Sequence, residues 1–565
     1  MRLQEQQFKK IKHIFKSLEE LYNRKESTFK DIRDLLAPGT GIFQGREQED
    51  IENDKINYQQ LLDSEPCSYL DTTKAGLYGG LINPAARWFE LDIDRTNPES
   101  NYLDDYEVGQ ILSGVKEFLY YLFAKSNFYD AMGPTIDEWV RYGSGVMLIE
   151  ERDYDFIFFN HLTAGEYYLG IDGDGKYNKL ARKFYKTADQ MVEDFGLENC
   201  PDKVKEAYNR GDFTTKFEIH HLIVPNEKTG IIPNRFKFLD LYWFESDVLR
   251  KSGFYSNPII VLPWARKNTR TVYAMGVGER ILGDTKELQN TVKALALHKA
   301  YLANPALALH TSLGKKPVLP GARYYTDQDP TKVASEIYRV NAYIQDLEGS
   351  RTLLLDKIRK MTYADLLLLF AQQQKGTMTA REVSAIVNEQ MTLLAPIYLQ
   401  AKNALQAIFD RVIDICVRRG AIPDNGVFDP RQIKIEFMSS IAKAQRMAEA
   451  GSIQDLIMYV TQLAQIKPAA LDYINEDAIV KDIAGRLGNY SKINSDEEVA
   501  AIRQMQAQQQ QAAMAQEQQA QQMKIAKDAS KAKIEPNNLL GQQVMQSGGV
   551  MPPSEEEIAA GGGSY

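Results

Sequence analysis

A short polar segment between two long helical stretches decides the fold prediction: residues 372–382, with the sequence QQQKGTMTARE. Its first seven residues include one cation, Lys375, and one glycine, Gly376, which gives the backbone freedom that a helix interior does not need. Thr379 and Glu382 then form a capping-box pattern, in which the hydroxyl and the carboxylate accept the free backbone N–H groups at a helix start. The segment is therefore predicted to be a loop between two helices.

Long amphipathic helices are predicted on both sides of this loop. One covers about residues 349–371, and the other covers about 379–419, where Pro396 should produce a kink because it removes a backbone hydrogen bond. A further long helix is predicted over 280–303. The interval between 303 and 349 is rich in Pro and Gly and contains short β-type stretches. Two helices joined by a proline-rich knob are thus followed by a loop and a third helix.

The first half of the chain divides into helices and a β-rich block. Apolar residues at three- and four-residue spacing predict helices over residues 3–36, 58–82, 103–129 and 133–142. From residue 145 to 264, short β-type runs alternate with turns, and one helix over Ala188–Phe195 interrupts them. The β-type runs cover residues 146–149, 156–159, 167–169, 217–224 and 236–244. The expected fold class is α+β, predominantly helical, with an antiparallel sheet.

The last part of the chain changes character twice. Residues 440–495 predict a small helical cluster. Eleven glutamines between Gln504 and Gln522 then predict either an uncapped helix or a disordered tract. The residues from Ser547 onward are rich in Gly, Pro, Ser and Glu, which is typical of disorder.

Composition and charge exclude several classes of protein. The chain has 565 residues and a net charge of −9, which argues against binding nucleic acid through bulk positive charge. Cys67, Cys200 and Cys416 lie far apart, so neither a disulfide framework nor a zinc ribbon organises the fold. The start is charged, and the longest apolar runs are far shorter than a membrane helix. Neither a secretory signal nor membrane insertion is expected.

Motifs for catalysis or metal binding are weak or missing. The P-loop pattern GxxxxGK[ST] does not occur. Residues 172–175, DGDG, resemble the start of a calcium loop, but Lys176 and Tyr177 stand where an oxygen ligand and a glycine are required, so a hairpin turn is favoured. His220 and His221 are adjacent and would point to opposite faces of a strand, so they cannot share a metal. No cofactor, no metal and no enzyme activity are expected.

Several short segments stand along the chain in a specific order: FKSLE at 15–19, LLAPG at 35–39, GGLINP at 79–84, RWF at 87–89, GSGVML at 143–148, TAGEYY at 163–168, RKF at 182–184, FG at 195–196, GVGERILGDTKEL at 276–288 and TMTAREV at 377–383. In this order they resemble the head-to-tail connector, or portal, proteins of short-tailed, podovirus-type bacteriophages. The resemblance covers roughly residues 5–490.

This resemblance implies a phage portal fold with wing, stem, clip and crown around a central DNA channel, built as a ring of, typically, twelve subunits. The antiparallel sheet would lie in the wing. The expected boundaries are 1–277 for the wing, 278–303 for the first stem helix, 304–346 for the clip, 347–371 for the second stem helix, 372–378 for the channel (tunnel) loop, 379–439 for the kinked helix and the return to the wing, 440–495 for the crown, 496–529 for a Gln-rich helical tail or barrel, and 530–565 for a disordered tail.

Three groups of residues are candidates for function. The DNA-facing channel loop would consist of Gln372, Gln373, Gln374, Lys375, Gly376, Thr377 and Met378. The cations expected to dock partners at the clip are Lys315, Lys316, Arg323, Lys332 and Arg339. The stem helices have more apolar length than one subunit can cover, and the residues expected at subunit contacts are Leu288, Val292, Leu295, Leu302, Leu353, Leu354, Ile358 and Met361.

The function implied by the resemblance is that of a viral portal at the unique capsid vertex, through which genomic DNA is packaged and later ejected. The expected partners are further copies of the chain, double-stranded DNA, the terminase, a tail adaptor protein, and the major capsid and scaffolding proteins. The protein would be assembled in the host cytoplasm and reside in the virion. An acidic chain suits a conduit, because many Lys and Arg contacts to phosphates would hold the DNA.

Two alternatives remain open from the residues themselves. One is another structural protein of the virion, such as a tail adaptor, which could also be acidic and rich in helices. The other is a metal-dependent hydrolase whose site is assembled from carboxylates that no sequence motif marks.

Overall fold

The computed structural model describes residues 4–43, 61–93, 105–303, 307–309, 329, 334–336, 344–367, 380–422, 429, 432–437, 458–460, 462, 477–480, 494 and 496–531. The chain divides into two units, Met1–Gly488 and Asn489–Tyr565. The first unit contains helices and antiparallel sheets, so the expected α+β class is confirmed.

A five-stranded antiparallel sheet forms one layer of the first unit. Its strand order is β4-β5-β6-β7-β8. The strands are β4 Tyr167–Ile171, β5 Tyr177–Thr187, β6 Lys216–Pro225, β7 Phe238–Phe244 and β8 Asp247–Phe254. β4 and β5 are joined by the predicted Asp-Gly turn, in which Asp172 Oδ1 accepts hydrogen bonds from the N–H groups of Asp174 and Lys176. This arrangement confirms the hairpin reading of that segment.

A three-stranded antiparallel sheet with the order β3-β2-β9 contributes to the main hydrophobic core. The strands are β2 Ser144–Arg152, β3 Phe156–Leu162 and β9 Ile259–Pro263. The helix α6, Phe128–Tyr142, packs against β2 and β3. Gly145 allows this close packing, since a Cβ there would lie 2.2 Å from the carbonyl oxygen of Thr135.

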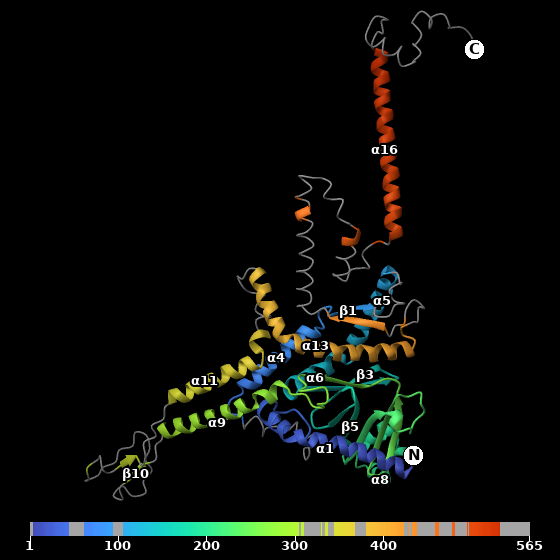
Figure 1. Cartoon of the computed structure of the whole chain (residues 1–565). Coiled ribbons are helices and arrows are strands. Elements are labelled where there is room, and N and C mark those ends of the chain that lie inside the picture. The colour runs from blue at the N-terminus through green and yellow to red at the C-terminus, as the bar shows by residue number, and fades with distance from the viewer. Residues whose placement is uncertain are drawn as a thin grey trace, which may run out of the picture. The chain divides into compact units, whose positions relative to one another are not determined.

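The first helix, α1, covers the five-stranded sheet along its length. It spans Glu5–Leu36 and contacts β4 and β5 (Figure 1). Its apolar stripe is buried as the spacing predicts, and the ring of Phe15 packs edge-on against Tyr168 and Trp243. The helix ends at Leu36, before the Pro-Gly break.

Smaller elements close the sides of this unit. The helices α7 Ala188–Phe195 and α8 Asp202–Asn209 form a separate small core on the five-stranded sheet, and two short 3-10 helices span Leu197–Asn199 and Asn226–Lys228. The helix α4 Glu65–Leu81 contacts α6, α11 and α1, and the helix α5 Asp105–Lys125 contacts α6 and β1. A two-stranded sheet joins distant parts of the chain, because β1 Phe89–Ile93 pairs with β12 Ile433–Phe437.

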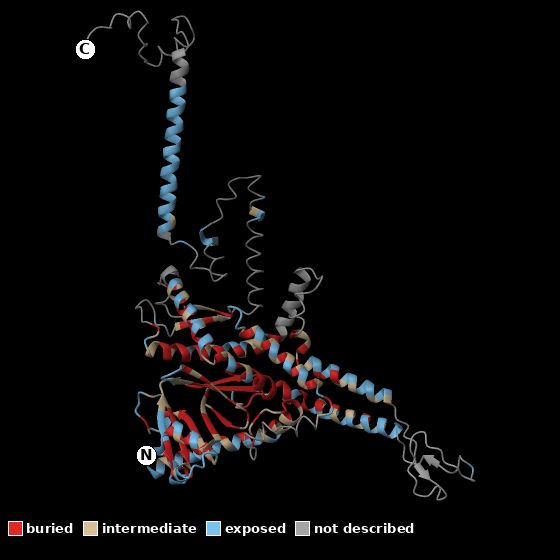
Figure 2. Cartoon of the chain, turned by 180° about the vertical axis from the view of Figure 1, so that it is seen from behind, coloured by how far each residue is buried: buried red, intermediate tan, exposed pale blue. Residues whose placement is uncertain are grey.

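Two long helices run side by side away from the sheets. They are α9 Val277–Ala303 and α11 Ile344–Met361 (Figure 1). Between them in sequence lies a short antiparallel pair, β10 Leu307–Leu309 and β11 Ala334–Glu336. Figure 2 shows that buried residues concentrate in the sheets and the helices that cover them, whereas the helix pair becomes mostly exposed away from the sheets.

The third long helix, α13, spans Ala380–Arg418 and contacts β2, β9 and β12. Pro396 lies inside it, and the ribbon changes direction along its length (Figure 1), as predicted for an internal proline. The second unit contains one described helix, α16 Asp496–Lys531. The Gln-rich tract is therefore helical, which was one of the two readings that its composition allowed.

Several predicted element bounds need correction. The helix expected over 58–82 begins only at Glu65, where Pro66 is suited to the first helical turn. The helix expected over 103–129 ends at Lys125, and α6 begins at Phe128 rather than near residue 133. The strands β1, β5, β8, β9 and β12 and the helix α8 were not predicted as elements.

Candidate functional site

The helix pair α9/α11 is held together by an apolar seam. Leu288 and Leu295 of α9 and Leu355 and Ile358 of α11 are buried. These residues are spaced by seven and by three positions, which places each pair on one face of its helix. The seam buries apolar surface that neither helix could cover alone, so the two helices form one structural element.

Ion pairs between the two helices show that they run antiparallel. Asp284 near the start of α9 pairs with Lys357 near the end of α11, with 2.6 Å between Oδ1 and Nζ. Lys299 and Glu348 form the opposite pair at 2.9 Å. Both pairs are partly exposed, so each contributes only about 0–1 kcal/mol. They fix the register of the pair more than its stability.

The segment before α4 anchors both helices where they leave the sheets. Arg351 of α11 donates from Nε to Asp63 Oδ2 at 2.8 Å and from Nη2 to Glu65 Oε1 at 2.9 Å. Gln289 of α9 donates to the backbone oxygen of Asp63 at 2.7 Å and accepts from the N–H of Leu62 at 2.9 Å. The same short segment therefore positions both helices.

The second helix of the pair stops earlier than the sequence predicts. A single helix over 347–371 was expected, but α11 spans Ile344–Met361, and the chain turns at Thr362 and Tyr363 before residues 364–367 become helical again. Tyr363 has a φ of 61°, which interrupts the helical hydrogen-bond ladder. The buried hydroxyl of Thr73 in α4 donates to the carbonyl oxygen of Thr362 at 2.7 Å and stabilises the break.

The C-terminal end of α13 is fixed to the sheets by arginines. Arg418 and Arg419 donate to the two carboxylate oxygens of Glu151 at 2.9 and 2.8 Å. Arg411 donates from Nη1 to Ser256 Oγ at 2.5 Å. The helix that follows the 372–378 segment is thus anchored at its far end by charged side chains, close to the junction of β2 and β3.

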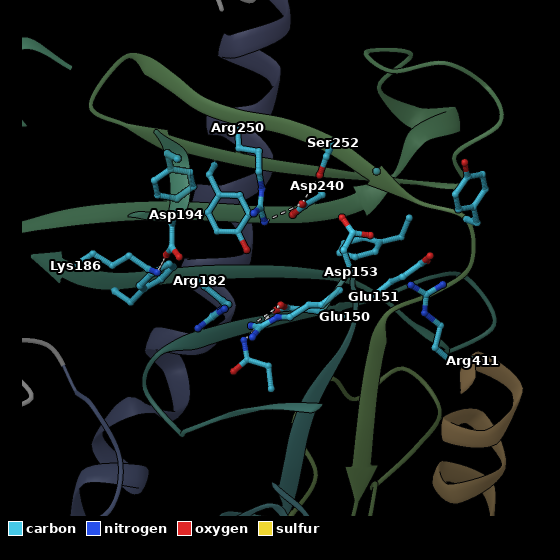
Figure 3. Close-up of a pocket in the computed structure, with 18 of the residues that line it drawn as sticks. Glu150, Glu151, Asp153, Arg182, Lys186, Asp194, Asp240, Arg250, Ser252 and Arg411 are labelled. Atoms are coloured by element: carbon cyan, nitrogen blue, oxygen red, sulfur yellow. Dashed lines mark hydrogen bonds and ion pairs between the residues drawn. The ribbon is translucent and has the colours of Figure 1, made fainter. Parts of the chain in front are cut away.

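A cavity of about 600 Å³ lies beside these arginines, between the two larger sheets and α13 (Figure 3). Charged side chains of both signs line it, and Figure 3 shows Asp240 and Arg250 from the five-stranded sheet opposite Glu150 and Glu151. Arg182, Asp240 and Arg411 are buried in its walls.

The charges in this cavity are largely compensated by one another. Arg182 hydrogen-bonds Glu166, and Asp240 accepts from Ser252 Oγ at 2.6 Å and faces His221 Nε2 at 2.7 Å. Burial alone would raise the pKa of Asp240, but the hydrogen bond from His221 and the nearby charges lower it overall. Burial and the neighbouring Arg418 lower the pKa of Arg411 to about 10. This arrangement suits a polar structural junction.

The described residues hold neither a metal centre nor a membrane span. Within the described ranges, no group of three or more His, Cys, Asp or Glu side chains could hold a metal ion. His220 stacks on Trp243, whereas His221 is buried on the other face of β6 and contacts Asp240. Among these residues no helix combines the length and the apolar character that crossing a bilayer requires.

The structure separates the predicted stem residues into two groups. Leu288 and Ile358 are fully buried between the helices of one chain, and Leu295 is 8% exposed. Leu302 and Leu353 are 52% and 72% exposed. The remaining three residues are partly buried against the same seam: Val292, Leu354 and Met361. Of the eight predicted residues, only Leu302 and Leu353 present large apolar surfaces outward, so the other six stabilise the helix pair first.

The other predicted site residues lie outside the described part of the chain. These are the clip residues Lys315, Lys316, Arg323, Lys332 and Arg339 and the loop residues Gln372, Gln373, Gln374, Lys375, Gly376, Thr377 and Met378. Thr379, the first residue of the predicted capping box, also lies outside, and α13 begins with the next residue.

Comparison with known proteins identifies the family. The profile described as "Bacteriophage head to tail connecting protein" matches residues 8–493, most of the chain. The chain belongs to this family. It is 29% identical over 519 residues to the portal protein of Salmonella phage epsilon15, covering 88% of this chain and 91% of the relative. It is 28% identical over 506 residues to the probable portal protein of Bordetella phage BPP-1, covering 86% of this chain and 88% of the relative.

Membership of the head-to-tail connecting protein family confirms the function that the order of segments predicted, that of a viral portal or head-to-tail connector. The family members are structural components of a phage particle, so the protein is not an enzyme. The alternative of a metal-dependent hydrolase is therefore wrong.

Sequence reasoning missed the polar junction around the cavity. Its residues come from elements far apart in sequence, namely β2, β3, β5, α7, β7, β8 and α13, and no motif connects them. One signal was present: Arg411, Asp414 and Arg418 recur at three- and four-residue spacing, which places them on one face of α13.

Proposed function

We propose that this chain forms the ring at the unique capsid vertex through which genomic DNA enters and later leaves the phage head. The ring would consist of, typically, twelve copies. The observation that carries the proposal is the antiparallel pair α9/α11, whose helices leave the sheets together and become exposed away from them. Exposed apolar residues on paired helices suit contacts between neighbouring copies.

The helix pair would form the stem of each subunit. Residues 278–303 and 347–371 would supply its two helices; α9 spans Val277–Ala303, and α11 spans Ile344–Met361 before the turn at Thr362 and Tyr363. Leu302 and Leu353 would contribute to the contacts between copies. Residues 304–346 would form the clip, whose cations dock the terminase during packaging and the tail adaptor afterwards.

The segment 372–378 would form the channel loop. It lies in sequence between the turn after α11 and the start of α13, and six of its seven side chains are uncharged or absent. Lys375 would make single contacts with passing phosphates, which are weak enough for DNA to slide. The helix that follows this loop, α13, is anchored at its far end by Arg411, Arg418 and Arg419.

The remaining parts follow the same scheme. The sheets and helices of 1–277, together with 379–439, would form the wing, and 440–495 would form the crown. Residues 496–529 lie within the helix α16, which supports a helical tail or barrel made from several copies. The ring would contact the major capsid and scaffolding proteins and, after assembly in the host cytoplasm, would remain in the virion.

Two double variants, one in the loop and one in the clip, test the roles proposed for these two segments. Lys375→Glu combined with Gly376→Ala should still give rings but should reduce DNA retention or the length of packaged DNA. Lys315→Glu combined with Lys316→Glu should also give rings but should weaken docking of the terminase or tail adaptor. Each variant is the control for the other. If both variants behave like the unmodified protein in DNA content and in docking, the assignments of loop and clip are wrong.

A further inference from the structure

A groove lies between α1 and the strands β4, β5 and β6 of the five-stranded sheet. Its volume is about 520 Å³, and its floor is apolar, with Ile14, Leu18 and Val224 among the lining residues. Three lysines stand around this floor: Lys10 on α1, Lys179 on β5 and Lys228 after β6. The residues that line the groove include no Asp or Glu.

The positive charge of this groove is only partly compensated, because the charge of Asp172 acts on Lys179 without forming an ion pair with it. Lys10 donates to the backbone oxygen of Lys228 at 2.5 Å, and Lys179 donates to the backbone oxygen of Ile171 at 3.3 Å. Among the described residues, none of the three ammonium groups forms an ion pair with a carboxylate. Burial and the neighbouring Lys228 lower the pKa of Lys179. A chain with a net charge of −9 thus concentrates three cations around an apolar surface.

A second surface of the same chain has the complementary chemistry. The turn between β2 and β3 presents Tyr154, whose side chain is 101% exposed, between the exposed carboxylates Asp153 and Asp155. A large aromatic side chain that is fully exposed has lost no water, so it retains its full capacity to stabilise a contact. The negative charges of the two carboxylates beside it are complementary to the positive charges of the groove lysines.

The turn is held in one conformation at its base. Arg419 donates from Nη2 to Asp153 Oδ1 at 3.0 Å, and the N–H of Ile157 donates to the carbonyl oxygen of Asp155 at 2.7 Å. Phe156 adopts a φ of 64°, an uncommon conformation for a phenylalanine. An ordered turn loses little entropy when it docks, which favours a contact with a preformed groove.

We propose that the turn Asp153–Asp155 of one subunit docks into the lysine groove of its neighbour, with Tyr154 on the apolar floor and the carboxylates beside the lysines. The inference rests on the proposed ring and names one of its subunit contacts. Tyr154 is fully exposed within its own chain, so the contact requires a second copy. Because the two surfaces differ, the contact is heterologous, and its repetition closes a ring when the rotation permits.

A DNA phosphate is the competing occupant, since lysines also bind phosphate. The apolar floor argues against it, because a phosphate would leave Ile14, Leu18 and Val224 uncovered. A tyrosine between carboxylates satisfies both parts of the groove. DNA binding at this groove is therefore an outcome that would contradict the proposal.

Two charge-reversed variants test the contact. The groove variant is Lys10→Glu with Lys228→Glu, and the turn variant is Asp153→Lys with Asp155→Lys. Native mass spectrometry over a range of protein concentrations measures ring formation. Each variant alone should need at least tenfold more protein than the unmodified chain to form rings, because like charges then face each other. A Tyr154→Ser variant should also assemble less well, with an unchanged unfolding midpoint of the monomer.

A mixture of the two variants distinguishes a lost contact from a damaged subunit. In alternating order, the reversed groove meets the reversed turn and the original groove meets the original turn, so an equimolar mixture should regain rings. Lys237→Glu with Lys251→Glu, two exposed lysines outside the groove, should leave assembly unchanged. If the groove variant changes only DNA binding and leaves assembly unchanged, the proposal is overturned.

The outcomes separate this contact from the ring itself. If the unmodified chain forms rings and both variants form them equally well, the contact is wrong and the ring stands. Variants that fail both alone and in the mixture also contradict the contact. If the unmodified chain forms no rings, the proposed function fails first.

Discussion

At the scale of single residues, a buried carboxyl group stands out. Glu138 on α6 is 3% exposed. Its Oε1 accepts hydrogen bonds from the hydroxyl of Thr163 and from the N–H of Ala164, which lies 2.9 Å away. Its Oε2 has no hydrogen-bond partner among the described atoms. His161 lies 3.8 Å away but does not compensate a negative charge, since burial lowers its own pKa to about 4. Glu138 is therefore poorly suited to ionisation.

This environment predicts a pH-dependent stability. Burial raises the pKa of Glu138 to about 8, and the charges of Asp137 and Glu166 act in the same direction. Between the ordinary pKa of a glutamate and about pH 8, Glu138 is therefore protonated in the folded state and ionised in the unfolded state. The contribution of protonated Glu138 to the free energy of unfolding is complete below the ordinary pKa of a glutamate. It falls as the pH rises towards 8 and is lost above pH 8.

Glu138→Gln should remove this dependence, because the amide stays neutral and its oxygen can still accept the two hydrogen bonds. We expect the variant to gain about 2 kcal/mol or more relative to the unmodified chain between pH 5 and pH 8, since each pKa unit corresponds to about 1.4 kcal/mol. Urea unfolding at the two pH values measures this difference. Glu227→Gln, at an exposed position, is the control and should follow the unmodified chain. Parallel pH profiles for all three proteins would show that Glu138 is ionised in the fold.

At the scale of elements, the helix pair α9/α11 combines an internal seam with an outward face. Ile358 is fully buried in the seam, whereas Leu353, five residues earlier on the same helix, is 72% exposed. The two residues have the same number of carbon atoms and lie on one helix. They therefore allow the stability of the subunit and its assembly to be tested separately.

Ile358→Ala should lower the free energy of unfolding by about 2–5 kcal/mol, because it leaves a cavity in the seam. Leu353→Ala should change it by less than about 0.5 kcal/mol. The exposed variant should instead weaken ring formation. Chemical unfolding and native mass spectrometry of both variants measure the two effects. Rings that form equally well with Leu353→Ala would exclude this residue from the contact between copies.

Much of the element pattern could be predicted from sequence because it depends on local periodicity. The stripe of α1, the interval occupied by α9, the Asp-Gly hairpin and the start of α13 all follow from spacing or turn chemistry. The strand β5 was missed because Tyr177–Thr187 alternates charged and apolar residues irregularly. The break after α11 was missed because Tyr363 adopts its positive φ only where Thr73, far away in sequence, holds the preceding carbonyl.

The candidate site was less predictable than the elements. Leu288 is buried and Leu302 is exposed, although both are leucines on the same helix. The difference arises because α11 covers only one face of α9 along the seam. The lysine groove depends on Lys10, Lys179 and Lys228, which three separate elements bring together. Periodicity describes one element at a time, so it could not reveal either arrangement.

At the scale of the whole molecule, the charges and the anchoring of the helices support a conduit more than a DNA-binding clamp. The chain is acidic overall, and many of its cations on the long helices are already paired, as Lys357 is with Asp284 and Arg351 with Glu65. Paired cations bind phosphates weakly, because a contact with DNA must first break the internal pair. Passing DNA would therefore meet few strong contacts on these helices.

The account's central claim is that copies of this chain close into a ring with an open centre. Electron microscopy of the purified full-length protein tests it most directly, with native mass spectrometry on the same sample to count the subunits. The expected result is a closed ring with a central hole and one defined number of copies, because heterologous contacts that close use every interface. Monomers alone under all salt conditions, or open filaments without closed rings, would contradict the claim.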